Sequence, residues 1–360
     1  MPNSDFHDKP YDEGTLSKLR IFELYAQEWI PVFLASKEPN FEEVHIFDFF
    51  SGPGKDSAGR YGSPLLILDQ LRQYHRKGLA GWGKVRIVVH LFDSDRRKVE
   101  ALAAVLKDEG WEISGVEIDL KSLEFRNALN QYRDVLENPR FAKLLIIDQY
   151  GVDEVSDEIF GYLINLPTTD FIFFLSSSTL HRFRDHPSIK QRIDELDDSY
   201  DVHRAAFSYY RRLVPPGHQV CLGKFSIKKR SNIYGLIFGS GHPLGIHKFL
   251  QVAWKNDELA GEANFDIERE NISPGEMVLG FDEMRPSKIR VFEEDLEAAL
   301  LAGRMESEAD VVRFCIESGM TCQHAAPVLK KLKADGAIAL DFRVPNVKNM
   351  RSPRPIRRLS

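Results

Sequence analysis

The chain has few cysteines, no long apolar run and no excess of positive charge. Its three cysteines, Cys221, Cys315 and Cys322, are too few and too scattered among 360 residues for a disulfide framework, and we expect them to be free thiols, not zinc ligands. No apolar run approaches the roughly 20 residues of a membrane helix, and the N-terminus does not resemble a signal peptide. The net charge of -6 excludes a uniformly basic protein but allows a local basic patch. We therefore expect a soluble, cytoplasmic protein with no membrane partner.

The most informative segment is residues 45–54, where a strand-like run ends at Asp48 and passes into a turn with Gly52 and Gly54. A buried strand that leads into a glycine turn brings the backbone close to a nucleotide-like ligand. The third glycine of the dinucleotide fingerprint is absent, and no Gly-Lys-Ser/Thr follows, as a phosphate loop requires. A carboxylate before the glycines attracts a cationic amino-acid arm and repels a pyrophosphate. The segment predicts S-adenosylmethionine as cofactor, bound by Asp48, Phe50, Gly52 and Gly54; the alternative is an ordinary strand-ending turn.

Strand-like and helix-like segments alternate through the first two thirds of the chain. This alternation predicts an α/β fold with a doubly wound, mostly parallel, Rossmann-related sheet. Two later strands separated by a short turn predict an antiparallel hairpin, which brings the sheet to seven strands. The expected strands are 44–50, 85–92, 116–120, 143–147, 170–175, 219–228 and 232–239.

The pattern changes in the last third of the chain. Three short helices followed by a β-ribbon predict a winged-helix-like domain at 291–342. The last residues contain many Lys and Arg and no acidic residue, so we expect 343–360 to be a basic, disordered tail. The predicted organisation is a flexible N-terminus at 1–14, the α/β domain at 15–276, a connector at 277–290, the winged helix and the tail.

Further carboxylates follow the second and third predicted strands. Asp93 directly follows Phe92, and a carboxylate at this position can accept hydrogen bonds from both ribose hydroxyls. Asp95 could share that role or cap the next helix. Asp119, at the end of the third strand, could accept the adenine amino group or be an ordinary surface carboxylate. We therefore add Asp93 and Asp119 to the predicted cofactor-binding residues.

Residues 148–151 follow the fourth strand, and ligand crevices in such sheets lie outside the carboxyl ends of the strands. Their sequence resembles the D/N-P-P-Y/F/W turn of amino-methyltransferases. The resemblance implies that Asp148 accepts a hydrogen bond from the target amine and that Tyr150 stacks on a base. Gln149 stands where proline is expected, which weakens the prediction of amine methylation. A strand-ending turn is the alternative.

Two groups of cations could bind nucleic acid. The first lies on loops at the predicted carboxyl edge, and the second lies at the end of the expected recognition helix. A solvated loop and a protein-docking surface are the respective alternatives. The residues are Lys55, Arg60, Arg182 and Arg184 at the edge, and Lys330, Lys331 and Lys333 on the helix.

These motifs together resemble a known family. Residues 47–54 with Gly62-Ser63-Pro64, the D-x-Y-G turn at 148–151, and the segment from His242 to Lys255 are similar to the three-Cys-motif partner proteins. The resemblance covers roughly residues 15–342 and also includes the layout of the class I methyltransferase sheet. It implies a methyltransferase-like fold and a partner protein with a three-cysteine, radical-type iron–sulfur motif. It does not imply a particular reaction.

Two functions of different classes follow. The first is an S-adenosylmethionine-dependent methyltransferase that acts on DNA or RNA, with Asp148 and Tyr150 placing the acceptor. The second is a non-catalytic binding module that recruits the iron–sulfur partner. A nuclease is a weaker third reading, because no compact set of carboxylates has metal-ligand spacing, although Asp93, Asp95, Asp119 and Asp148 could converge on Mg²⁺.

Overall fold

The computed structural model describes residues 9–149, 154–175, 199–229, 232–256 and 287–359. The chain forms two compact units, Met1–His242 and Pro243–Ser360. Helix α10 (Pro243–Asn256) belongs to the second unit, so the division falls earlier than the predicted boundary at 276. Most of the predicted connector at 277–290 lies outside the described residues. None of the described helices is long and apolar enough to cross a membrane.

The first unit is built on one seven-stranded sheet with the order β3-β2-β1-β4-β5-β7-β6. Strands β1 to β5 are parallel, and β7 pairs antiparallel with both β5 and β6. This arrangement confirms the predicted mostly parallel α/β sheet closed by a hairpin. The strands are β1 (Glu43–Asp48), β2 (Arg86–Asp93), β3 (Val116–Ser122), β4 (Phe141–Ile147), β5 (Thr169–Leu175), β6 (Cys221–Lys229) and β7 (Asn232–Ser240).

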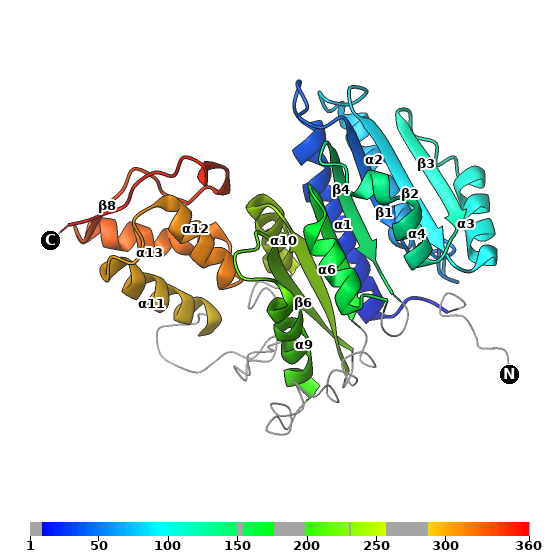
Figure 1. Cartoon of the computed structure of the whole chain (residues 1–360). Helices are drawn as coiled ribbons and strands as arrows, with labels where there is room; N and C mark the ends of the chain where they lie inside the picture. Colours follow the sequence, from blue (N-terminus) through cyan, green and yellow to red (C-terminus); the bar gives the residue numbers. More distant parts are fainter. Residues whose placement is uncertain (1–8, 150–153, 176–198, 230–231, 257–286, 360) are drawn as a thin grey trace. The chain divides into compact units, whose positions relative to one another are not determined.

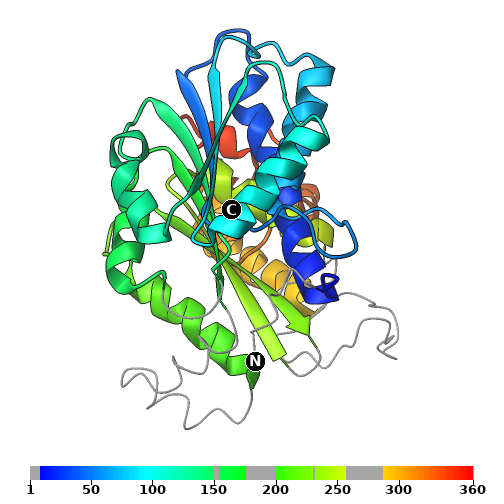
Figure 2. The ribbon, with the colours of Figure 1, turned by 90° about the vertical axis from the view of Figure 1, so that its right-hand side faces the viewer.

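Helices cover both faces of this sheet (Figures 1 and 2). The central strands β1, β2 and β4 are almost completely buried, as their near-continuous apolar sequences predict. One face carries α1 (Glu13–Leu34), α2 (Ser63–Lys77) and α3 (Arg96–Asp108); the other carries α4 (Phe125–Gln131), α5 (Arg133–Leu136), α6 (Asp157–Asn165) and α9 (Ser199–Leu213). A core rich in phenylalanine lies between the sheet and the helices of this second face.

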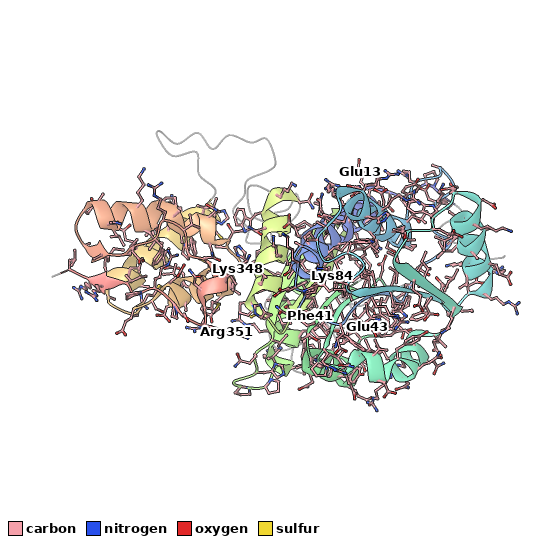
Figure 3. The ribbon with its side chains drawn as sticks, turned by 90° about the horizontal axis from the view of Figure 1, so that it is seen from above. Glu13, Phe41, Glu43, Lys84, Lys348 and Arg351 are labelled. Atoms are coloured by element: carbon pink, nitrogen blue, oxygen red, sulfur yellow. The ribbon has the colours of Figure 1, made fainter. Side chains whose placement is uncertain are left out.

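The parallel strands give the sheet two chemically different edges. Phe41, Glu43 and Lys84 lie near the starts of β1 and β2 and mark the amino edge (Figure 3). The carboxyl edge is formed by the residues at and just after the end of each strand, which include Asp93 at the end of β2 and Asp148 after β4. Because parallel strands all end at this edge, it brings together side chains that are far apart in the sequence.

The second unit has its own apolar core, to which Trp254 of α10 contributes. Trp254 donates a hydrogen bond from Nε1 to the carbonyl oxygen of Gly319 at 2.9 Å. The other elements are α11 (Ser287–Leu301), α12 (Glu308–Glu317), α13 (Cys322–Ala334), β8 (Ile338–Ala339), the 3₁₀-helix η2 (Val347–Asn349) and β9 (Arg357–Arg358). Three helices and a two-stranded ribbon are present, and their assignment as a winged helix stays a prediction.

The prediction of a disordered tail is wrong for residues 343–359. Strand β9 pairs with β8, and Ile356 is buried in the core of the second unit. The reason is a buried carboxylate that composition alone does not reveal. Glu308 is fully buried and accepts hydrogen bonds from the Arg354 guanidinium and from the backbone N–H of Asn346. Arg354 therefore holds the tail in place, while Lys348 and Arg351 remain exposed (Figure 3).

Candidate functional site

A cavity opens at the carboxyl edge of the first unit, where the strand order reverses between β1 and β4. Its volume open to water-sized molecules is about 190 Å³. This reversal is the topological switch point, the usual position of ligand crevices in open α/β sheets. The lining comes from the ends of β1, β2 and β4, from α1 and the residue Tyr11 before it, from the starts of α2 and α3, and from the segment before α6. The residues are Tyr11, Thr15, Lys18, Leu19, Phe50, Ser51, Gly62, Ser63, Asp93, Ser94, Lys98, Asp148 and Glu154.

The glycine turn follows Phe50 and Ser51, which line the cavity, while Gly52 and Gly54 are not among the described lining residues. Gly52 has a φ of 60° and donates its N–H to Asp93 Oδ2 at 3.1 Å. Gly54 has a φ of 84°, and a Cβ atom there would lie 2.7 Å from Leu102 Cδ1. Both positions therefore require glycine. Gly62 closes the loop by donating its N–H to the carbonyl oxygen of Gly54 at 2.8 Å.

Asp48 lies directly below the turn and is fully buried. Its Oδ1 accepts a hydrogen bond from the Phe50 N–H at 3.2 Å, whereas Oδ2 has no hydrogen-bond partner in the described part of the chain. Burial raises the pKa of Asp48 to about 7, with smaller contributions from the carboxylates of Asp148 and Asp93 in the same direction. The nearby Ser63 hydroxyl and the Phe50 N–H act in the opposite direction and lower the pKa of Asp48. Neither of them donates a hydrogen bond to Oδ2. The site thus contains a carboxyl group without a full set of partners.

Asp93 and Asp95 have different roles in the loop after β2. Asp93 lines the cavity, and its two oxygens accept the N–H groups of Gly52 and Asp95. Asp95 is the N-cap of α3, accepts the N–H of Arg97 at 2.9 Å and pairs with the Arg97 side chain. The structure therefore favours the capping alternative for Asp95 and leaves Asp93 as the cavity carboxylate.

Asp148 also lines the cavity, where it meets a residue that the sequence analysis missed. The ammonium group of Lys18 on α1 lies 2.7 Å from Asp148 Oδ1, and the two side chains are 7% and 15% exposed. The same ammonium group lies 4.6 Å from the ring centroid of Phe174. The sequence did contain a signal for this residue. Lys18 lies on the same face of α1 as the buried residues Phe22 and Tyr25, and an apolar helix face rarely carries a charge without a partner.

Tyr11, which lies just before α1, is also fixed at the site, although residues 1–14 were predicted to be flexible; residues 1–8 lie outside the described residues. Tyr11 is buried, lines the cavity and donates its N–H to Asp56 Oδ2 at 2.6 Å. Arg60 pairs with Asp56 at 2.7 Å and donates to the carbonyl oxygen of Tyr11. Asp56 therefore ties residue 11 to the glycine loop by several hydrogen bonds.

Gln149 has a structural role in place of the expected proline. Its Nε2 donates to the carbonyl oxygen of Phe174 at 2.7 Å, and its Oε1 accepts the N–H of Val155 at 3.3 Å. The residue is 2% exposed, and its side chain connects the end of β5 to the residue before the N-cap of α6. Tyr150, which was predicted to stack on the target base, lies outside the described residues.

Asp119 lies within β3 and is not among the described residues that line the cavity. Its Oδ2 lies 3.0 Å from His90 Nδ1, and His90 Nε2 lies 2.9 Å from His45 Nδ1. The chain of contacts ends at Glu43 Oε2, 3.0 Å from His45 Nε2. The structure therefore places Asp119 in a polar chain across β1, β2 and β3 and does not bring it to the other predicted cofactor residues.

Most of the predicted nucleic-acid contacts that the structure describes already have partners within the protein. Lys55 pairs with Glu109, Arg60 with Asp56, and Lys331 with Glu297. Lys333 donates to a backbone carbonyl oxygen, that of Leu340. Lys330 lies on α13, and Arg182 and Arg184 fall outside the described residues.

The carboxylates do not form a metal site in the part of the chain that the structure describes. No group of three or more His, Cys, Asp or Glu side chains there could hold an ion. Asp95 caps a helix and Asp119 lies in the polar chain, so the four aspartates of the nuclease reading do not form such a group.

Comparisons with known proteins add little to this geometry. No protein-family model matches the chain, and no curated protein matches it either. Solved structures that align with it include an rRNA methylase from Streptococcus thermophilus, at 10% identity over 64% of this chain and 98% of that one, with a TM-score of 0.32. The O-methyltransferase TomG from Streptomyces achromogenes, in complex with SAM, aligns at 12% identity over 64% and 90%, with a TM-score of 0.33.

An O-methyltransferase from Bacillus cereus, in complex with SAH, aligns at 12% identity over 64% of this chain and 91% of that one, with a TM-score of 0.35. Scores this low carry no argument about the present chain. Its own strand order and the position of the cavity define a doubly wound, mostly parallel α/β fold with a ligand cavity at the switch point.

The residues around the cavity fit S-adenosylmethionine in charge and position. Asp48 Oδ2 is a buried acceptor without a partner, and Asp93 faces the cavity after β2. Four carboxyl groups, including Asp148 and Glu154, lie in or beside the cavity, and Lys18 and Lys98 are the lysines among its lining residues. Such an excess of carboxylates favours a ligand with a cationic arm and hydroxyl donors.

Proposed function

We propose that the protein binds S-adenosylmethionine and is a methyltransferase. The observation that carries this proposal is the cavity at the switch point of the sheet, which Asp93 lines and beside which Asp48 lies buried. Asp93 would accept hydrogen bonds from the ribose hydroxyls, and the backbone around Gly52 would allow close approach. When bound, the cofactor supplies an activated methyl group. The protein needs mainly to position the acceptor, so the proposal does not require a general acid–base pair.

Calorimetric titration with S-adenosylmethionine and S-adenosylhomocysteine tests the cofactor site. We expect micromolar binding to the wild type and at least tenfold weaker binding to Asp93→Asn. Asp95→Asn is the matched control, because Asp95 lies on the same loop but caps α3. The absence of binding to the wild type at millimolar ligand would reject the proposal.

Nucleic acid is the acceptor that we propose for this reaction. The exposed cations Lys348 and Arg351 on the second unit support it (Figure 3), whereas several other predicted contacts are already paired. Incubation with radiolabelled S-adenosylmethionine and total cellular RNA or DNA should give labelled polymer. Asp148→Ala should lose this label while its cofactor affinity is retained.

A second candidate function is a non-catalytic binding module that recruits the iron–sulfur partner. Two observations favour it. Asp148 is already paired with Lys18, and Gln149, which stands where the acceptor-binding turn has proline, forms a hydrogen bond with the backbone at the end of β5. Cofactor binding without any labelled RNA or DNA would support this candidate over the methyltransferase.

A further inference from the structure

The pairing of Lys18 with Asp148 bears on which acceptor the cavity can take. Lys18 Nζ lies 2.7 Å from Asp148 Oδ1 and 4.6 Å from the centroid of the Phe174 ring. Lys18 and Asp148 both line the cavity, and they lie 130 residues apart in the sequence. The ammonium group thus lies over an aromatic face and against a carboxylate, which is how proteins bind a primary ammonium ion.

The surroundings of Lys18 show that this position is costly for a charge. Its side chain is 7% exposed, and it lies on the same face of α1 as Phe22, Tyr25 and Trp29, all of which are buried. Desolvation of a buried ion pair offsets much of its attraction, and a well-packed apolar pair is often as stable. Stability alone therefore does not account for a lysine here, whereas its place in the cavity gives it a role toward a ligand.

From this geometry we infer that Lys18 determines the acceptor specificity of the cavity, an inference that rests on the proposed methyltransferase function. The lysine occupies the site on Asp148 that a target amine would need. The exocyclic amine of a base has its lone pair delocalised into the ring, so it would meet Nζ with N–H groups on both sides, and an ammonium ion would also be repelled by its charge. An oxygen atom or a ring nitrogen with a localised lone pair can instead accept a hydrogen bond from Nζ. The acceptor class is therefore a hydroxyl oxygen or a ring nitrogen, and not an exocyclic amine.

Chemical replacement of the lysine tests the inference without a known substrate. Lys18→Ala removes three carbons and the nitrogen, which propylammonium restores as a free ion. We expect propylammonium to bind saturably to Lys18→Ala, at least tenfold more tightly than to the wild type or to the double variant Lys18→Ala/Asp148→Asn. Calorimetry and thermal shift measure this, with sodium chloride at equal ionic strength as the reference. Arg20→Ala, which changes an exposed cation on the same helix, should behave like the wild type.

Two results would overturn the inference. Equal binding of propylammonium to the wild type and to Lys18→Ala would show that Lys18 leaves Asp148 open to amines. No binding to a folded Lys18→Ala would show that Asp148 does not form an ammonium site. If Lys18→Ala does not fold, Lys18→Met removes the charged nitrogen and keeps the apolar stem, and ammonium becomes the probe with the same expectations.

The same proteins separate this inference from the cofactor proposal. S-adenosylhomocysteine is titrated into the wild type and into each variant. Failure to bind the wild type rejects the proposed function, whereas the propylammonium result decides the occupancy of Asp148 in either case.

Discussion

Replacement of Asp48 by asparagine should stabilise the ligand-free protein at alkaline pH. Burial raises the pKa of Asp48 from 3.8 to about 7, so the folded state holds a proton that the unfolded state releases. When a carboxyl group has a higher pKa in the folded state than in the unfolded state, the free energy of unfolding of the protein falls as the pH rises from the unfolded pKa through the folded pKa. At about 1.4 kcal/mol for each pH unit, the full loss above pH 7 is about 4 kcal/mol. Asparagine is neutral throughout and avoids this loss.

The assay is urea unfolding of the wild type and Asp48→Asn between pH 5 and pH 8. The stability of the variant relative to the wild type should increase by about 3 kcal/mol over this range, because most of the interval between the two pKa values lies within it. Other titrating groups are common to both proteins and cancel in the difference. Asp95→Asn, at an exposed N-cap, should show no such increase. A difference between wild type and Asp48→Asn that stays constant with pH would refute the reasoning.

Two further predictions concern parts of the chain away from the cavity. Glu308→Ala should cost about 2–4 kcal/mol because it leaves Arg354 without its buried partner, and hydrogen exchange should increase at 346–358; unchanged exchange there would contradict the proposed role of the carboxylate. The chain through His45 and His90 connects two buried imidazole rings. Burial lowers the pKa of His45 to about 3 and holds the pKa of His90 below its ordinary value, although Asp119 partly opposes the effect on His90. We therefore expect ¹⁵N NMR at pH 7 to show both rings neutral, and a charged ring would disprove this.

The features that could be predicted from the sequence are those in which the signal is local. The apolar runs of β1, β2 and β4 are buried on both faces, and Gly52 and Gly54 take the positive φ angles that a tight turn needs. Asp93 is the last residue of β2, so its place at the carboxyl edge follows from the parallel arrangement alone.

The features that could not be predicted depend on partners far apart in the sequence. Lys18 and Asp148 are 130 residues apart, and nothing near Lys18 indicates which carboxylate it meets. The tail looked disordered because its composition is basic, but its order depends on Glu308, 46 residues before Arg354. Asp119 was misplaced because β3 extends to Ser122, which leaves the aspartate inside the strand beside His90.

The N-terminal helix connects these observations to the function. Tyr11, Thr15, Lys18 and Leu19 all line the cavity, so the segment before β1 forms one wall of the site. Lys18 places a positive charge against Asp148 in the cavity, and Asp56 fixes the segment to the glycine loop through Tyr11. The proposed cofactor-binding residues on the sheet alone would account for binding of S-adenosylmethionine but not for the choice of acceptor. The helix adds the side chain that distinguishes one acceptor from another, so changes in α1 should alter specificity more than cofactor affinity.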